Sequence, residues 1–246
     1  MARSAVQTGR QFRGRIVEAC WAYSIGNVPV ALRVLGAAAD VAGALFAAAD
    51  RTGEVMVTVD GHQFTVPGEP ADHNVNEVVW VDACCLAFVV RRDAVLRILA
   101  GYPTQRLGAA PGSGEGDVYR IHLAAALRLF WLDDPGWPQP LAEAERLSQP
   151  EHRTVAAPRF AAMYRALAPM LRAIATGDQD AFSDGLEAAL RAHKAVHGRG
   201  AEAKRATGLL ALPAAGVAAL GVDRGLKLEV ESSYAPRWLV EGADPR

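Results

Sequence analysis

The sequence predicts a mainly α-helical protein: an irregular array of helical hairpins with one β-hairpin at about residues 54–66 and a short C-terminal strand at about 227–231. Three observations support this fold class. They are long alanine-rich segments with little internal proline, apolar residues that alternate around Asp60–Gly61, and paired helical segments joined at Gly177–Asp178. Alanine has the highest helix propensity, whereas alternation is typical of a strand that buries one face. Helices are therefore expected to form most of the core.

The 246-residue chain is long enough to bury a sizeable core, and its sequence predicts one mainly helical domain over residues 1–246. Hydrophobic residues make up 51% of the chain and charged residues 22%, with a formal net charge of −1. A charge so near zero gives no field that would attract nucleic acid or an anionic membrane, so neither is expected as a partner. Residues 1–26 are locally basic and are predicted as a first helix or an N-terminal extension.

Cysteine usage and the apolar segments predict a cytoplasmic protein. The 3 cysteines have no CxxC spacing, and Cys84 and Cys85 lie within the apolar run "VVWVDACCLAFVV". Such a pattern argues against a disulfide framework and favours a reducing compartment. The longest uncharged run, residues 208–222, contains Pro213 and is shorter than the roughly 20 residues that span a bilayer. It is predicted as a buried helix.

Two elements of different periodicity are predicted in the first third of the chain. Residues 27–50, rich in alanine, leucine and valine with Pro29 in the first turn, predict a helix. Residues 54–66 alternate in polarity around Asp60–Gly61, the dipeptide preferred in a type I′ turn, and predict a β-hairpin. A two-residue loop then places three cross-strand pairs on one face: Val59 with His62, Val57 with Phe64, and Val55 with Val66.

The rest of the chain is predicted as helices separated by loops. Residues 76–93 are apolar nearly all round and predict a central core helix, which is followed by a helix ending at Pro103. Residues 110–117 predict a surface loop, and residues 117–134 predict an amphipathic helix. In the C-terminal half, two helices are joined at Gly177–Asp178, where the aspartate is placed to cap the second helix.

The most suggestive chemical feature is a pair of histidines, His193 and His197, at the end of a predicted helix over residues 179–197. Their spacing puts both rings on one helical face, as in the H-E-x-x-H zinc motif. Lys194 stands where that motif has its general base, and the other histidines are scattered, so no ligand set is complete. The residues favour a buried, hydrogen-bonded histidine over a partner-binding surface and over a metal site. No nucleophile has an assignable base, so neither a cofactor nor enzymatic activity is expected.

The closing third of the chain carries an ordered set of short elements: His193 and Lys194, residues 208–212, Gly225, residues 228–232, Tyr234, Pro236 and Leu239. In the order of these elements the chain resembles the immunity protein 49 family of bacterial proteins. Upstream, the hairpin segment and the apolar helices that follow it are also similar, so the resemblance spans about residues 35–239. The chain departs from the family at Val196 and His197, where an aromatic pair is common, and at Pro213 after "LLAL".

The resemblance implies a function as well as a fold. It implies a protein that binds and neutralises a cognate toxin of a polymorphic toxin system by direct contact, without catalysis or cofactor. A toxin domain is then the expected partner, and the candidate contact residues are His193, Lys194, Glu229, Glu231, Tyr234 and Arg237. That Tyr234 and Pro236 instead lock the C-terminus onto the core is an alternative of at least equal weight. Two other functions stay open: a helical-repeat-like interaction or regulatory module with a non-toxin partner, and a metal-dependent enzyme that uses His193 and His197.

Overall fold

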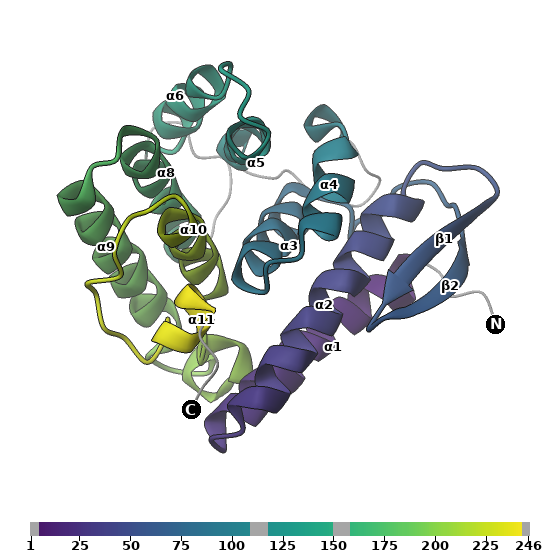
Figure 1. The fold of residues 1–246 in the computed structure, drawn as a ribbon, viewed down its shortest axis with the longest axis horizontal. Helices are drawn as coiled ribbons and strands as arrows, with labels where there is room; N and C mark the ends of the chain where they lie inside the picture. The colour runs from purple at the N-terminus through teal and green to yellow at the C-terminus, as the bar shows by residue number, and fades with distance from the viewer. Residues whose placement is uncertain (1–4, 109–117, 150–157, 243–246) are drawn as a thin grey trace.

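The computed structural model of the protein describes residues 5–108, 118–149 and 158–242, and helices make up most of this part of the chain (Figure 1). The elements follow in this order: α1 (Ala5–Ser24), α2 (Val28–Ala48), β1 (Glu54–Val59), β2 (His62–Pro67), α3 (Glu77–Val89), α4 (Asp93–Gly101), α5 (Val118–Trp131), α6 (Pro138–Leu147), α7 (Pro158–Arg165), α8 (Leu167–Thr176), α9 (Gln179–His197), α10 (Leu212–Asp223) and α11 (Arg237–Glu241). The predicted mainly α-helical fold class is confirmed. The predicted loop at residues 110–117 lies outside the described residues.

Helices α1 and α2 form an antiparallel hairpin, and the strands β1 and β2 lie beside the end of α2 (Figure 1). Asn27 caps α2, because its side-chain oxygen accepts a hydrogen bond from the backbone N–H of Val30 at 3.3 Å. Gly43 lets α4 cross α2 closely, since a Cβ at this position would lie 3.3 Å from the Val95 side chain. The helix predicted over residues 27–50 and the predicted N-terminal helix are therefore both present.

The β-hairpin has the predicted register. Asp60 and Gly61 form its turn with φ angles of 52° and 77°, and a type I′ turn requires positive φ at both positions. The three predicted cross-strand pairs all form. Strand β1 packs against α2 and buries Val57, whereas the cross-strand partner Phe64 on β2 is 51% exposed. The hairpin therefore adds one buried side chain to the core and leaves much of both strands in solvent.

The centre of the core is α3 packed against α10. Trp80 in α3 is 1% exposed, and its indole N–H donates to the Leu99 carbonyl at 3.1 Å. Gly216 in α10 lies so near Cys85 that a Cβ there would be 2.4 Å from the Cys85 backbone. Pro213 lies in the first turn of α10, where proline has no hydrogen bond to lose, so it begins this helix. Both predicted core helices are confirmed as buried.

Two details of the predicted fold are wrong. Residues 227–231 form no strand, because their backbone pairs with a side chain and not with another strand. Lys227 N donates to Gln179 Oε1 at 2.8 Å, and Gln179 Nε2 donates to the Lys227 carbonyl at 3.0 Å. The helix before Gly177 is also divided, into α7 and α8, because Pro169 has no N–H to continue the hydrogen-bond ladder.

The junction between α8 and α9 is as predicted. Gly177 ends α8 with a φ of 68°, in the left-handed region that glycine adopts without steric cost. The Asp178 side chain then caps α9 by accepting a hydrogen bond from Ala181 N at 3.0 Å. Local sequence signals therefore fix where this helical hairpin turns.

Two helical stretches, Val28–Ala48 and Ala206–Asp223, are long and apolar enough to cross a membrane by length and composition alone. Most of each stretch is buried inside the fold, and core helices pass the same test. Both contribute to one continuous cluster of buried apolar side chains that extends from Phe12 to Val240. Their hydrophobicity is therefore accounted for by packing within the chain.

Candidate functional site

His193 is buried and hydrogen-bonded to the backbone. The residue is 2% exposed, and its Nε2 lies 2.9 Å from the Gly208 carbonyl oxygen. Because a carbonyl only accepts, Nε2 carries the proton, and Nδ1 is left without a hydrogen-bond partner among the described residues. Burial lowers the pKa of His193 to about 4, with the nearby His197 lowering it further and the bond to Gly208 opposing both. The buried, hydrogen-bonded histidine favoured by the sequence is therefore confirmed.

His197 stacks beside His193, with ring centroids 4.5 Å apart. Burial lowers the pKa of His197 as well, so both rings are uncharged at neutral pH. Within residues 5–108, 118–149 and 158–242, no group of three or more His, Cys, Asp or Glu side chains is placed to hold one metal ion. The two rings pack against each other.

The histidine pair borders a groove of about 500 Å³, here called the histidine groove, between α1, α3, α7 and α9. Its lining is largely apolar, with polar groups from Arg13, Asp82 and Tyr164. The Tyr164 hydroxyl donates to Asp82 Oδ1 at 2.7 Å. Burial raises the pKa of Asp82 to about 6, while this hydrogen bond and the charges of Arg120 and Arg13 hold it lower than burial alone would. The carboxyl is therefore satisfied from within the fold.

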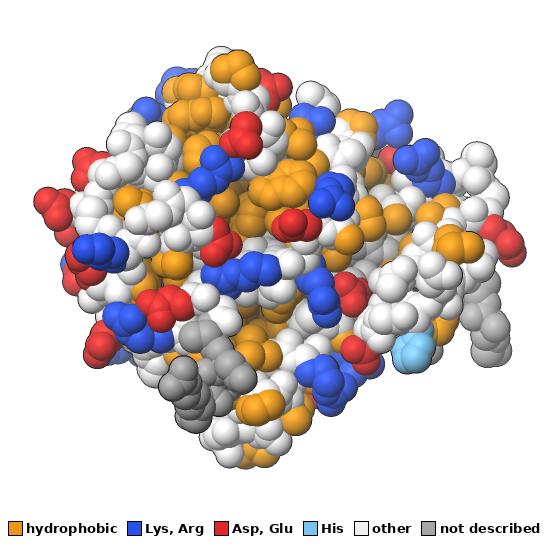
Figure 2. Space-filling view, in the orientation of Figure 1, with side chains coloured by type: hydrophobic (Ala, Val, Ile, Leu, Met, Phe, Trp, Pro, Cys, Tyr) orange, Lys and Arg blue, Asp and Glu red, His pale blue; other side chains and the backbone are white. Residues whose placement is uncertain are grey.

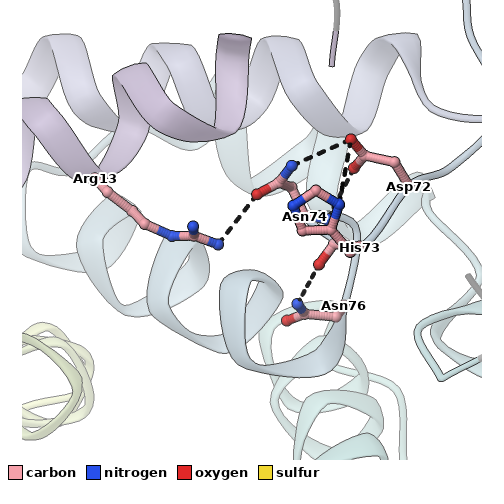
Figure 3. Close-up of polar contacts among 5 residues, drawn as sticks. All are labelled: Arg13, Asp72, His73, Asn74 and Asn76. Carbon is pink, nitrogen blue, oxygen red and sulfur yellow. Dashed lines mark hydrogen bonds and ion pairs between the residues drawn. The ribbon is translucent and has the colours of Figure 1, made fainter. Parts of the chain in front are cut away.

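A polar network joins the wall of this groove to the loop before α3 (Figure 3). Arg13 Nη2 donates to Asn74 Oδ1 at 3.1 Å, and Asn74 Nδ2 donates to Asp72 Oδ2 at 3.1 Å. Asn76 Nδ2 donates to the His73 carbonyl at 2.7 Å, and the Asn76 side chain also caps α3. Asn74 is buried against α1. These groups pair with one another, so the network fixes α1 to the loop.

The six predicted contact residues fall into two environments. His193 is buried, and its ring meets the half-buried Tyr234 edge-on at a centroid distance of 5.1 Å. Lys194, Glu229, Glu231 and Arg237 are exposed. Glu229 and Arg237 line one shallow depression of about 600 Å³, and Arg237 Nη1 pairs with Glu241 Oε1 at 2.7 Å. The prediction that this set contacts a partner stays a prediction.

The closing segment, residues 226–241, is tied down at several points. The Tyr234 carbonyl accepts a hydrogen bond from Ala211 N at 2.8 Å. Tyr23 in α1 donates from its hydroxyl to the Ser233 carbonyl at 2.8 Å, and its ring lies 5.6 Å from that of Trp238. Tyr234 therefore helps to hold the C-terminal segment on the core, the alternative that the sequence left open for this side chain.

A second and larger groove, of about 800 Å³, lies between the end of α2, the start of β1, and α4. It is here called the hairpin groove, and sequence reasoning did not find it. Asp50 lies in its wall with a φ of 58°, and its Oδ2 accepts from the Tyr102 hydroxyl at 3.0 Å and from Arg106 at 3.3 Å. Burial alone would raise the pKa of Asp50, but hydrogen bonds from Ala71 N, Tyr102 and Arg106 outweigh it and lower that pKa.

The hairpin groove also carries groups that have no partner within the fold. Arg51 and Arg97 are exposed, without a hydrogen bond or ion pair from their side chains to the described residues. Met56 is 68% exposed and Ile98 is 37% exposed. In Figure 2, Lys and Arg side chains gather between α4 and the loop that leads into β1. No sequence pattern links these residues, because only the fold brings α4 to the start of β1.

A family model described as immunity protein 49 matches residues 29–239. The chain belongs to the immunity protein 49 family. The resemblance seen in the closing segment is confirmed, and within this family member the hairpin groove lies wholly inside the matched residues. The histidine groove also uses Phe12, Arg13 and Ile16 of α1, which lie outside the match. Comparison with curated proteins and with solved structures found no match.

Proposed function

We propose that this chain is an immunity protein that binds a cognate bacterial toxin by direct contact and so neutralises it. The observation that carries the proposal is the immunity protein 49 match over residues 29–239, which includes both grooves except for the α1 side of the histidine groove. Neutralisation of this kind needs an interface, typically about 1,200–2,000 Å² in total, and no chemical step.

The environment of the reactive side chains supports a role without catalysis or cofactor. His193 is 2% exposed and Asp82 accepts from the Tyr164 hydroxyl, so both groups are held within the fold. Burial raises the pKa of the Cys84 and Cys85 thiols well above the usual range, which keeps both in the unreactive thiol form. The buried free thiols also fit the proposal that the protein acts in the reducing cytoplasm.

The exposed residues of the predicted set remain proposed contacts. Lys194, Glu229, Glu231 and Arg237 are accessible, and Tyr234 is partly so. A toxin that covered this surface would meet charges of both signs, because Glu229 and Arg237 line the same depression. Charges at the rim of an interface chiefly change the association rate and its salt dependence. Single substitutions here are therefore expected to have small effects on affinity.

The proposal is tested by co-expression with the toxin domain encoded next to this chain's gene. Cells that make the toxin alone should stop growing, and cells that also make this chain should grow. Purified chain should form a stoichiometric complex with a catalytically inactive form of the toxin domain, measured by titration calorimetry. An unrelated helical protein of similar size is the control. Failure of the chain both to bind and to rescue would overturn the proposal, and recovery of a non-toxin partner would favour the interaction module instead.

A further inference from the structure

We propose that the toxin docks in the hairpin groove by laying an extended, acidic segment against the free edge at the start of β1. This inference rests on the proposed function and names a surface, distinct from the predicted contact residues Lys194, Glu229, Glu231 and Arg237, and its chemistry of contact. Three independent features of the groove support it: an unpaired strand edge, free positive charges and exposed apolar side chains.

Strand β1 offers hydrogen-bonding groups along one edge. The sheet has the order β1–β2, so in the described chain β1 pairs with a strand on one side only. In a two-residue hairpin the pair that closes the turn, Val59 with His62, is hydrogen-bonded, and alternate residues of β1 therefore direct their N–H and C=O groups outward. Met56 is one of these residues, and it lines the groove. An extended chain placed there can pair with it, as in other cases of strand addition.

The charges of the groove favour an acidic segment. Its lining holds Arg51, Arg97 and Arg106 against Asp50 and Glu54. Asp50 is already hydrogen-bonded to Arg106 and Tyr102. The two remaining arginines, Arg51 and Arg97, therefore have only the Glu54 carboxylate to balance their charge within the groove. A partner with Asp or Glu in register would satisfy these cations.

The exposed apolar groups of the groove indicate that the partner is a protein segment. Met56 and Ile98 are exposed beside the free charges, and apolar side chains surrounded by polar ones are typical of protein contact sites.

The groove is already formed in the unbound chain. Asp50 joins the end of α2 to the chain after α4 and to the loop after β2, since it accepts hydrogen bonds from Tyr102, from Arg106 and from Ala71 N, the last at 3.0 Å. At the base of the hairpin, Gly68 N donates to the Gly53 carbonyl at 2.6 Å. A surface held in this way loses little conformational entropy when a partner binds, which favours affinity.

The charge component is tested with the double variant Arg51→Glu, Arg97→Glu. The probe is the catalytically inactive toxin domain encoded beside this chain's gene, and the readout is the dissociation constant from titration calorimetry. We expect the dissociation constant to rise at least about tenfold. The matched control is Arg33→Glu, Arg199→Glu, which makes the same change in net charge at exposed arginines outside the groove. The control should bind within about twofold of the wild type.

The strand edge is tested with Met56→Pro, which removes an outward-facing N–H without touching the bonds between β1 and β2. Thr65→Pro makes the same change on the outer edge of β2, directly across the hairpin, and is the control. We expect only Met56→Pro to weaken toxin binding, by about tenfold or more. Circular dichroism and thermal unfolding, applied to every variant, check that the fold is retained.

The outcomes separate the two proposals. If the wild type binds and rescues but the Arg51 and Arg97 variant or Met56→Pro binds equally well, this inference is wrong and the proposed function stands. If the Arg33 and Arg199 control weakens binding as much as the groove variant, the effect is one of net charge and the inference is again wrong. If the wild-type chain neither binds the toxin nor rescues growth, both the proposed function and this inference are wrong.

Discussion

The histidine groove and the hairpin groove differ in how their polar groups are used. In the histidine groove, Arg13, Tyr164 and His193 each donate to an acceptor within the fold. In the hairpin groove, Arg51 and Arg97 have no such acceptor in the described part of the chain. A buried polar group left unpaired costs about 1–3 kcal/mol, so the first groove gains stability from its internal pairs. The second keeps charges in solvent, where a partner can reach them.

The largest expected effect on stability lies in the histidine groove. Phe12 is buried in its wall, and Phe12→Ala should lower the free energy of unfolding by about 3–5 kcal/mol, because the cavity left behind cannot fully collapse. Urea unfolding measures the change. Toxin binding by the folded fraction should be unchanged. If Phe12→Ala kept wild-type stability but no longer bound the toxin, the binding site would lie in the histidine groove instead.

The pH dependence of stability separates two side chains that line the histidine groove. Burial raises the pKa of Asp82 from 3.8 to about 6, so its contribution is present below about pH 4 and is lost as the pH rises through 6. Burial lowers the pKa of His193 from 6.5 to about 4, so its contribution is present above pH 6.5 and is lost as the pH falls through 4. In the wild type the two changes oppose each other between pH 4 and 6.5.

Single substitutions should separate the pH dependence that comes from Asp82 from the pH dependence that comes from His193. Asp82→Asn leaves the histidines without the opposing carboxyl, so the free energy of unfolding should increase with pH across the window by on the order of 2–3 kcal/mol. His193→Gln leaves the carboxyl together with His197, whose pKa is also lowered, so the free energy of unfolding should increase less with pH than in Asp82→Asn, or decrease. Urea unfolding at a series of pH values measures both slopes. Equal slopes in the two variants would contradict the opposed burial effects.

A smaller effect is expected at the turn beside the hairpin groove. Gly61 has a φ of 77°, so Gly61→Ala should cost about 1 kcal/mol of stability and weaken toxin binding as β1 loses its fixed edge. Gly14 lies in α1 with no neighbouring atom within 4 Å of an added Cβ. Gly14→Ala is the same substitution at a helical position, so it should raise the free energy of unfolding by about 0.5–1 kcal/mol and leave toxin binding unaltered. Thermal unfolding and titration calorimetry measure the two quantities.

The smallest effect on stability is expected for the free charges. Arg51→Ala and Arg97→Ala remove exposed side chains without internal partners, so each should change the free energy of unfolding by less than about 0.5 kcal/mol. Each should nevertheless weaken toxin binding, and more strongly at low salt than at high salt. A loss of stability larger than that of Gly61→Ala would contradict the contrast between the grooves.

The local features of the fold could be predicted because each depends on neighbouring residues. Asp60–Gly61 fixed the hairpin register, and Asp178 and Gly177 set the junction of α8 and α9. The strand at residues 227–231 was predicted wrongly, because an alternating segment becomes a strand only if another strand lies beside it. Here the neighbour is the side chain of Gln179, a contact across 48 positions in the sequence.

The sequence by itself determined that the chain is mainly helical, where its hairpin turns, and to which family it belongs. These depend on propensity, periodicity and the order of short motifs, all readable along the chain. Tertiary structure alone decided that His193 faces a backbone carbonyl and that Arg51 lies near Arg97. Burial and proximity arise from the packing of α4 on α2 at Gly43, and no local pattern encodes which distant surfaces meet.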